Sequence, residues 1–91
     1  MAVTVRIPTP LRRFTNDQSD VEIDGGTVGE VMDNLEAAHA GIKEKLVDEA
    51  GDIRRFVNVY VNDEDIRFLD GAETPVKDGD SVTIVPAIAG G

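Results

Sequence analysis

The strongest strand signal in this chain is the run Phe56-Val57-Asn58-Val59-Tyr60-Val61. Successive residues of a strand point to opposite faces, so Val57, Val59 and Val61 share one face and the other three residues share the second. Valine is β-branched and packs well on a pleated, half-buried surface. The run therefore predicts a strand over residues 56–61 whose valine face lies against a core.

Further strand patterns lie on both sides of this run. They cover residues 3–7, 20–24, 65–68 and 81–85. The first two are separated by a long loop, and we expect them to pair as a hairpin. Asn62-Asp63-Glu64 is typical of a turn, after which residues 65–68 are expected to return as a short strand.

One helix is predicted between the second and third strands. Thr27-Val28-Gly29-Glu30 matches a capping box, in which Thr27 accepts from the amide three residues on and Glu30 reaches back to the amide of Thr27. An apolar stripe at helical spacing follows, formed by Val28, Val31, Met32 and Leu35. Gly41 is a candidate for the C′ position, which would end the helix near His39 or Ala40. Ile42 and Leu46 indicate one more short helical turn.

The predicted order of elements is β-β-α-β-β-β. One main helix packed on one face of a mixed sheet is an α+β arrangement of two layers. With 91 residues the chain suffices for one domain with a single core. We assign this domain to residues 1–86 and expect residues 87–91 to form a flexible C-terminal tail.

The composition excludes several classes of function. The chain has no cysteine, which removes disulfides, thiolate metal sites and cysteine nucleophiles. Its 18 acidic and 9 basic residues give a formal charge of −9, which disfavours nucleic acid and anionic membranes and favours a basic protein partner. No apolar run reaches the length of a membrane span, and no signal peptide is evident, so a cytoplasmic location is expected.

No catalytic or cofactor-binding constellation is evident in the sequence. The single histidine, His39, falls at the predicted helix end, and nothing brings it together with Ser19 or Ser81. Asp63-Glu64-Asp65 lacks the spacing of a calcium loop and fits a solvated turn. We therefore expect no metal, no cofactor and no enzymatic activity, and a function in binding, in being modified, or in both.

The end of the printed sequence points to such a function. Residues 87–91 are Ala87, Ile88, Ala89, Gly90 and Gly91. Glycine has no Cβ, so a terminal Gly-Gly suits a chain end that enters a narrow tunnel in another protein. At about 3.3–3.6 Å per residue, this segment would extend roughly 17 Å beyond the domain.

Two blocks of sequence carry a resemblance to a known family. Residues 55–67, RFVNVYVNDEDIR, and residues 78–91, DGDSVTIVPAIAGG, resemble the ubiquitin-like sulfur carriers of the MoaD/ThiS family, and are most similar to its actinobacterial CysO-type branch. The resemblance covers essentially the whole chain. It implies the β-grasp fold and a role as a substrate protein rather than a catalyst.

The resemblance implies that sulfur is loaded onto the chain and then transferred to an acceptor enzyme. An E1-like enzyme would use ATP to adenylate the carboxylate of Gly91, and a sulfur donor would convert the adenylate to a thiocarboxylate. In the CysO-type branch the acceptor would be a PLP-dependent cysteine synthase, followed by a metalloprotease that releases cysteine. Gly90, Ala89, Ile88 and Ala87 would thread the tail into these partners.

Docking would also require a surface on the domain. Phe56 and Tyr60 are expected opposite the valine face of their strand, and Val85 opposite the core face of the last strand. We expect the three to form an apolar patch on the helix-free side of the sheet, where the activating enzyme would bind.

Four alternatives remain open at this stage. Within the family, the chain could be the small subunit of molybdopterin synthase or a thiamin-type carrier. From a different class, it could be a ubiquitin-like modifier joined to lysines through Gly91. It could also be a β-grasp interaction module with an incidental tail.

Overall fold

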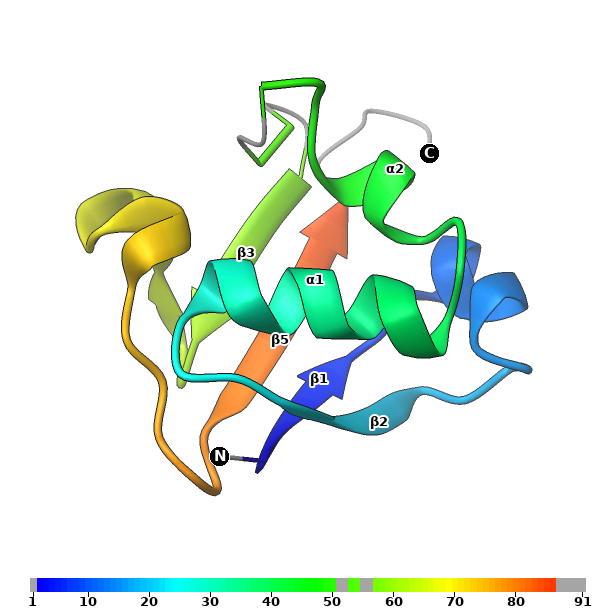
Figure 1. The fold of residues 1–91 in the computed structure, drawn as a ribbon, viewed down its shortest axis with the longest axis horizontal. Coiled ribbons are helices and arrows are strands. Elements are labelled where there is room, and N and C mark those ends of the chain that lie inside the picture. The colour runs from blue at the N-terminus through cyan, green and yellow to red at the C-terminus, as the bar shows by residue number, and fades with distance from the viewer. Residues whose placement is uncertain (1, 51–52, 55–56, 87–91) are drawn as a thin grey trace.

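A computed structural model describes residues 2–50, 53–54 and 57–86. One mixed sheet of five strands forms a single layer, in the spatial order β2-β1-β5-β3-β4. The strands are β1 (Ala2–Arg6), β2 (Asp20–Asp24), β3 (Val57–Val61), β4 (Glu64–Asp65) and β5 (Ser81–Pro86). The helix α1 (Val28–Ala38) lies across one face of this sheet, as Figure 1 shows. The predicted α+β two-layer class is confirmed.

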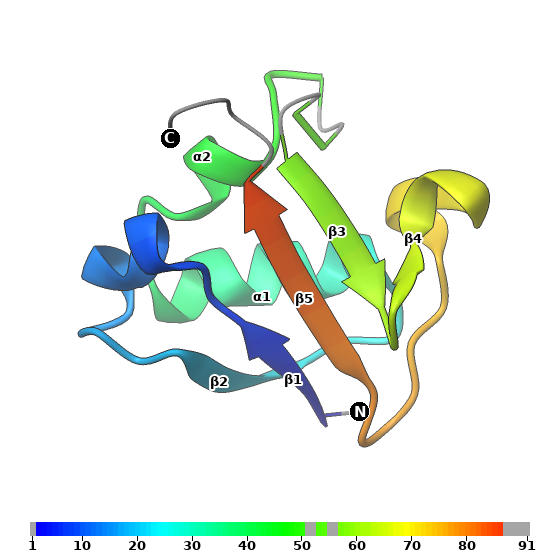
Figure 2. The same ribbon diagram turned by 180° about the vertical axis from the view of Figure 1, so that it is seen from behind.

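The last strand occupies the centre of the sheet. β5 pairs in parallel with β1 and antiparallel with β3, while β1 and β2 form the predicted antiparallel hairpin. Seen from behind in Figure 2, β1, β5 and β3 lie in front of α1, and no described element covers them. The sheet therefore has one face against the helix and one open face.

The predicted cap of α1 forms, with one difference. Thr27 Oγ1 accepts from the amide of Glu30 at 3.2 Å, as expected of a capping box. The Glu30 carboxylate, however, accepts from the amide of Gly26 at 2.8 Å and not from that of Thr27. Val28 donates instead to the carbonyl of Thr74 at 3.0 Å, which ties the helix start to a distant loop.

The helix α1 ends one or two residues before the predicted His39 or Ala40, and the predicted role of Gly41 as C′ residue is wrong. The helix ends at Ala38 with His39 as its C-cap, so Gly41 is not the residue that follows the cap. Gly41 has a φ of 98°, and its amide donates to the carboxylate of Glu36 at 2.9 Å. Glycine is required here by the left-handed turn into the short helix α2 (Lys43–Leu46).

The predicted strand over residues 65–68 is also wrong. β4 stops at Asp65, and Ile66–Phe68 forms a 3-10 turn, η2. Asp65 Oδ1 accepts from the amide of Arg67 at 2.8 Å, which caps the turn. The Ile66 side chain is only 3% exposed, so burying it in the core favours the turn over a longer edge strand. Two other 3-10 turns are η1 (Thr9–Phe14) and η3 (Gly71–Glu73).

The core lies between the sheet and its helices. The apolar stripe of α1 is buried, as are the valine face of β3 and the inward residues of β5. Ile42 and Leu46, which flank and end α2, are fully buried beside them. At about 1.5–3 kcal/mol for each aliphatic side chain removed from water, this layer provides the main driving force for folding.

Candidate functional site

The candidate site begins where β5 ends. β5 has a strand on each side, and its last residue, Pro86, is paired with Val57 of β3. Pairing on both edges holds β5 in place as far as Pro86, the last described residue. The predicted sulfur-carrying residue Gly91 and the predicted threading residues Gly90, Ala89, Ile88 and Ala87 lie outside the described residues, and their roles stay predictions.

The end of β5 forms part of the open face of the sheet. Val85 lies opposite Asn58, and Tyr60 lies opposite Thr83, in the register of β3 and β5. Directly paired residues of antiparallel strands point to the same face. Because Val57, Val59 and Ile84 are buried on the helix side, Tyr60 and Val85 lie on the open side, as expected.

The chemical character of this face is mixed. Val85 is 38% exposed and Tyr60 is half-buried, with an amide and a hydroxyl group opposite them. Phe56, the third residue of the expected patch, lies outside the described residues. The described part therefore offers one valine and one tyrosine among polar groups, so a partner would need both apolar contacts and hydrogen bonds.

A polar network fixes the start of β5 to the end of β3. Asn62 Oδ1 accepts from the amide of Ser81 at 3.0 Å, and Asn62 Nδ2 donates to Asp80 Oδ1 at 2.9 Å. The other Asp80 oxygen accepts from the amide of Lys77 at 2.8 Å. The hydrogen bond from Asn62, followed by that from Lys77, lowers the pKa of Asp80 below its usual value. The sequence indicated two separate turns here but not that they join.

A second carboxylate, on Glu36, links α1 to α2. It accepts from the amides of Gly41 and Lys43, each at 2.9 Å. The bond from Gly41 and then that from Lys43 lower the pKa of Glu36. Sequence reasoning missed this role, because Glu36 lies off the apolar stripe and its partners follow only after the helix ends.

The residues considered for catalysis do not form a site. His39 is the C-cap of α1, whereas Ser81 begins β5 on the sheet. Asn62 and Asp63 form the turn between β3 and β4 with positive φ values of 50° and 74°. Among the described residues, no three His, Cys, Asp or Glu side chains gather closely enough to hold a metal ion.

Comparison with known proteins decides the family. A family model described as the ThiS family matches residues 5–91, and thus nearly the whole chain. The chain belongs to the ThiS family. The resemblance drawn from residues 55–67 and 78–91 is thereby confirmed, together with the β-grasp fold.

Relatives of this ThiS-family chain include proteins described as sulfur carriers. It is 55% identical to "Sulfur carrier protein CysO" of Mycobacterium tuberculosis, with all of both chains covered. It matches a chain in the crystal structure of the Amycolatopsis orientalis BexX/CysO complex at 58% identity and a TM-score of 0.93, covering 99% of this chain and 100% of that one. It is also 40% identical to "Small archaeal modifier protein 3" of Haloferax volcanii, over 75% of this chain and 73% of that protein.

None of the helices in the described part of the chain is long and apolar enough to cross a bilayer.

Proposed function

We propose that this ThiS-family protein carries sulfur as a thiocarboxylate on Gly91 and delivers it in cysteine biosynthesis. The observation that carries the proposal is the 55% identity to a sulfur carrier over the full length of both chains. The family match extends through Gly91, so the similarity includes the segment that would react.

The chemistry suits a terminal glycine. An α-carboxyl group has a reference pKa of about 3.3–3.7, so it is ionised at neutral pH and acts as an oxygen nucleophile. It attacks the α-phosphorus of ATP and displaces pyrophosphate, which gives an acyl-adenylate. Sulfide then attacks the acyl carbon and displaces AMP, which leaves the chain with a thiocarboxylate.

In this proposal the chain is a co-substrate and not an enzyme. The partners would be an E1-like activating enzyme, a PLP-dependent cysteine synthase that accepts the sulfur, and a metalloprotease that releases the product. Because the activation step consumes ATP, we propose a cytoplasmic location for the chain. The β-grasp domain would serve as the surface by which each partner recognises the chain.

Intact-mass measurement tests the proposal. The chain is incubated with an E1-like enzyme, ATP and a sulfide source, and the mass should rise by the difference between one sulfur and one oxygen. A chain lacking Gly91 is the matched control and should show no change. If the full chain never acquires sulfur with cognate activating enzymes, the proposal is wrong.

A ubiquitin-like modifier is the second candidate function. The 40% identity to a small archaeal modifier protein favours it. Such a modifier would form amide bonds between Gly91 and lysine side chains of other proteins. Conjugates of higher mass in a lysate, absent for the chain without Gly91, would support this function, and a thiocarboxylate without conjugates would support sulfur transfer alone.

A further inference from the structure

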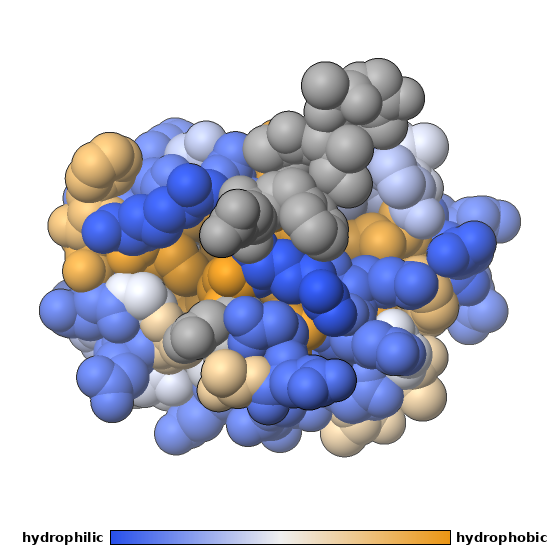
Figure 3. Space-filling model, turned by 90° about the horizontal axis from the view of Figure 1, so that it is seen from above, coloured by the Kyte–Doolittle hydropathy of each residue, from blue (hydrophilic) through white to orange (hydrophobic). Residues whose placement is uncertain are grey.

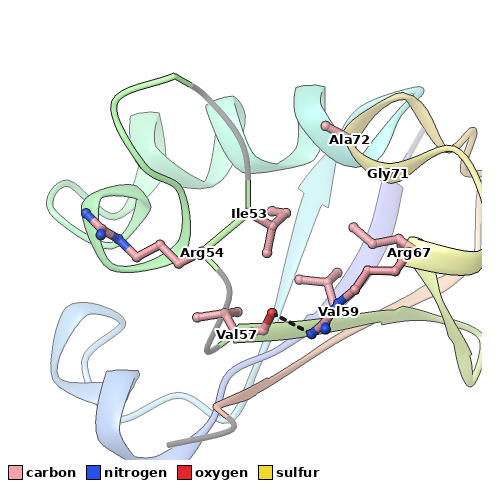
Figure 4. A pocket seen from close by; sticks show the side chains of 8 residues that line it. Ile53, Arg54, Val57, Val59, Arg67, Gly71 and Ala72 are labelled. Carbon is pink, nitrogen blue, oxygen red and sulfur yellow. Dashed lines mark hydrogen bonds between the residues drawn. The ribbon is translucent and has the colours of Figure 1, made fainter.

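A small hollow opens on the helix side of the sheet, beyond the start of α1. Figure 4 shows it between Ile53, the strand β3 and the turns that follow β4. Its volume is about 300 Å³, and it is lined by Ile53, Arg54, Val57, Val59, Ile66, Arg67, Gly71 and Ala72. This is the lower limit of small-molecule pockets, so the hollow suits one or two side chains rather than a cofactor.

The hollow exists because β4 is short. β4 pairs only with Tyr60 and Val61, so within the described residues the first part of β3 has a strand on the β5 side alone. Arg67 from η2 lies across this edge, and its Nη2 donates to the carbonyl of Val57 at 3.4 Å. The Arg67 side chain thus occupies the position beside β3 where a longer β4 would have paired.

Two exposed apolar residues follow the arginine that lines the hollow. Phe68 is 88% exposed and Leu69 is 39% exposed, and they come directly after Arg67 in the sequence. Figure 3 shows hydrophobic surface on this side of the molecule, with hydrophilic side chains around it. Adjacent exposed apolar side chains offer area that a partner can bury, and aromatic residues are enriched in protein interfaces.

One guanidinium lies at the hollow of this acidic chain, whose formal charge is −9. It belongs to Arg67, whereas the Arg54 side chain points away from the hollow toward α2 (Figure 4), where its Nε donates to the carbonyl of Glu44 at 3.1 Å. Arg67 Nε lies 3.8 Å from Asp65 Oδ1. A guanidinium has five N–H donors, so Arg67 keeps capacity to bind a carboxylate.

We propose that this surface, formed by Arg67, Phe68 and Leu69 beside the hollow, docks a partner protein. The partner presents an aliphatic side chain with a carboxylate beside it. The aliphatic group enters the hollow, the carboxylate pairs with the guanidinium of Arg67, and Phe68 and Leu69 cover the contact. We call this the η2 surface. A second copy of the chain is disfavoured because it would bring together two molecules of charge −9.

The η2 surface lies apart from the open face. Val57 and Val59 line the hollow, whereas Tyr60 and Val85 lie on the opposite side of the sheet. A partner at the η2 surface therefore leaves the open face accessible.

Amide chemical shifts of the full-length chain test the proposal. The probe is the blocked peptide acetyl-Gly-Glu-Leu-Glu-Gly-amide, and the matched peptides replace both glutamates by lysine or the leucine by glycine. The first peptide should give saturable shifts at Ile66, Arg67 and Ala72 at millimolar concentration. The matched peptides should give none there. Absence of saturable shifts with the first peptide, or equal shifts with the lysine peptide, overturns the proposal.

Three variants separate recognition from folding. Arg67→Gln should weaken the peptide at least about fivefold, because a hydrogen bond between charged groups is lost. Arg13→Gln, the same change of charge on η1, should leave the affinity unchanged. Phe68→Ser should also weaken the peptide while thermal unfolding stays at the wild-type temperature, because Phe68 is exposed. Equal affinity for Arg67→Gln and Arg13→Gln overturns the proposal. If the shifts at Ile66, Arg67 and Ala72 depend on protein concentration without peptide, the surface binds a second copy and the proposal is also overturned.

Discussion

The two flanks of β3, which are its two hydrogen-bonding edges, differ in how many of their residues are paired with a neighbouring strand. On the β5 side, all five residues of β3 are paired, from Val57 with Pro86 to Val61 with Val82. On the β4 side, only Tyr60 and Val61 are paired, and the remainder borders the hollow. The first flank holds the C-terminal strand in the centre of the fold. The second leaves a rim of arginine and exposed phenylalanine, so one strand contributes both to stability and to a contact surface.

The largest effect is expected from placing a charge on the buried face of β3. Val59 is 1% exposed, and Val59→Asp would bury a carboxylate without a partner. The free energy of unfolding should fall by more than about 4 kcal/mol, which is much of the stability of a domain of this size. Urea titration measures this. Asn58→Asp, on the open face of the same strand, is the control and should cost about 1 kcal/mol or less.

The next largest effect compares a buried residue, Ile66, with an exposed residue, Phe68, on the β4 side of β3. Ile66 is 3% exposed, so Ile66→Ala should reduce the free energy of unfolding by about 2–4 kcal/mol through lost burial and a cavity. Phe68→Ala should change it by no more than about 0.5 kcal/mol. Chemical denaturation of both variants gives the comparison. Equal losses would mean that Phe68 is a packing residue and not a contact residue.

A smaller effect is expected on the open face at the end of β5. Val85→Asp should reduce ATP–pyrophosphate exchange by the activating enzyme about tenfold, which corresponds to about 1.4 kcal/mol of binding free energy. The exposed position of Val85 should keep the unfolding temperature near that of the wild type. Ala50→Asp adds the same charge to an exposed residue after α2 and should leave the exchange unchanged. An unaltered rate for Val85→Asp would remove the open face from the activation step.

The smallest effect concerns pH and two carboxylates, that of Asp80 between the end of β3 and the start of β5 and that of Glu36 between α1 and α2. The usual pKa values are 4.5 for Glu36 and 3.8 for Asp80, and both are lowered in the folded chain. The ionised forms are therefore favoured by folding, so their contribution is fully present above these values and is lost as the pH falls through the lower folded values. Unfolding measured as a function of pH should show stability falling from about pH 5 downward.

Variants test the origin of this pH dependence. Glu36→Gln and Asp80→Asn should each make the loss of stability with falling pH less steep, because each removes one carboxylate that is ionised in the fold. Glu22→Gln changes an exposed carboxylate of β2 and is the matched control. An identical slope for all three variants would show that neither network contributes.

Much of the architecture follows from local patterns. Three predicted features were confirmed: the capping threonine, the apolar stripe of α1 and the valine face of β3. Each depends only on residues that lie close together in the sequence. The strand predicted over 65–68 failed because burial of Ile66 and the cap at Asp65 outweighed strand propensity. Propensity is a weak preference, and packing against distant residues readily overrides it.

The sequence by itself determined the class of the fold, the family, and the Gly-Gly segment on which the proposed function rests. These are properties of composition, periodicity and order along the chain, which need no knowledge of distant neighbours. Only the tertiary structure decided that β5 lies between β1 and β3, that Asn62 joins Asp80 and Ser81, and that Ile53 and Arg67 line one hollow. These pairs lie far apart in sequence, and they come together only when burial of the apolar faces pays the entropy of closing the chain.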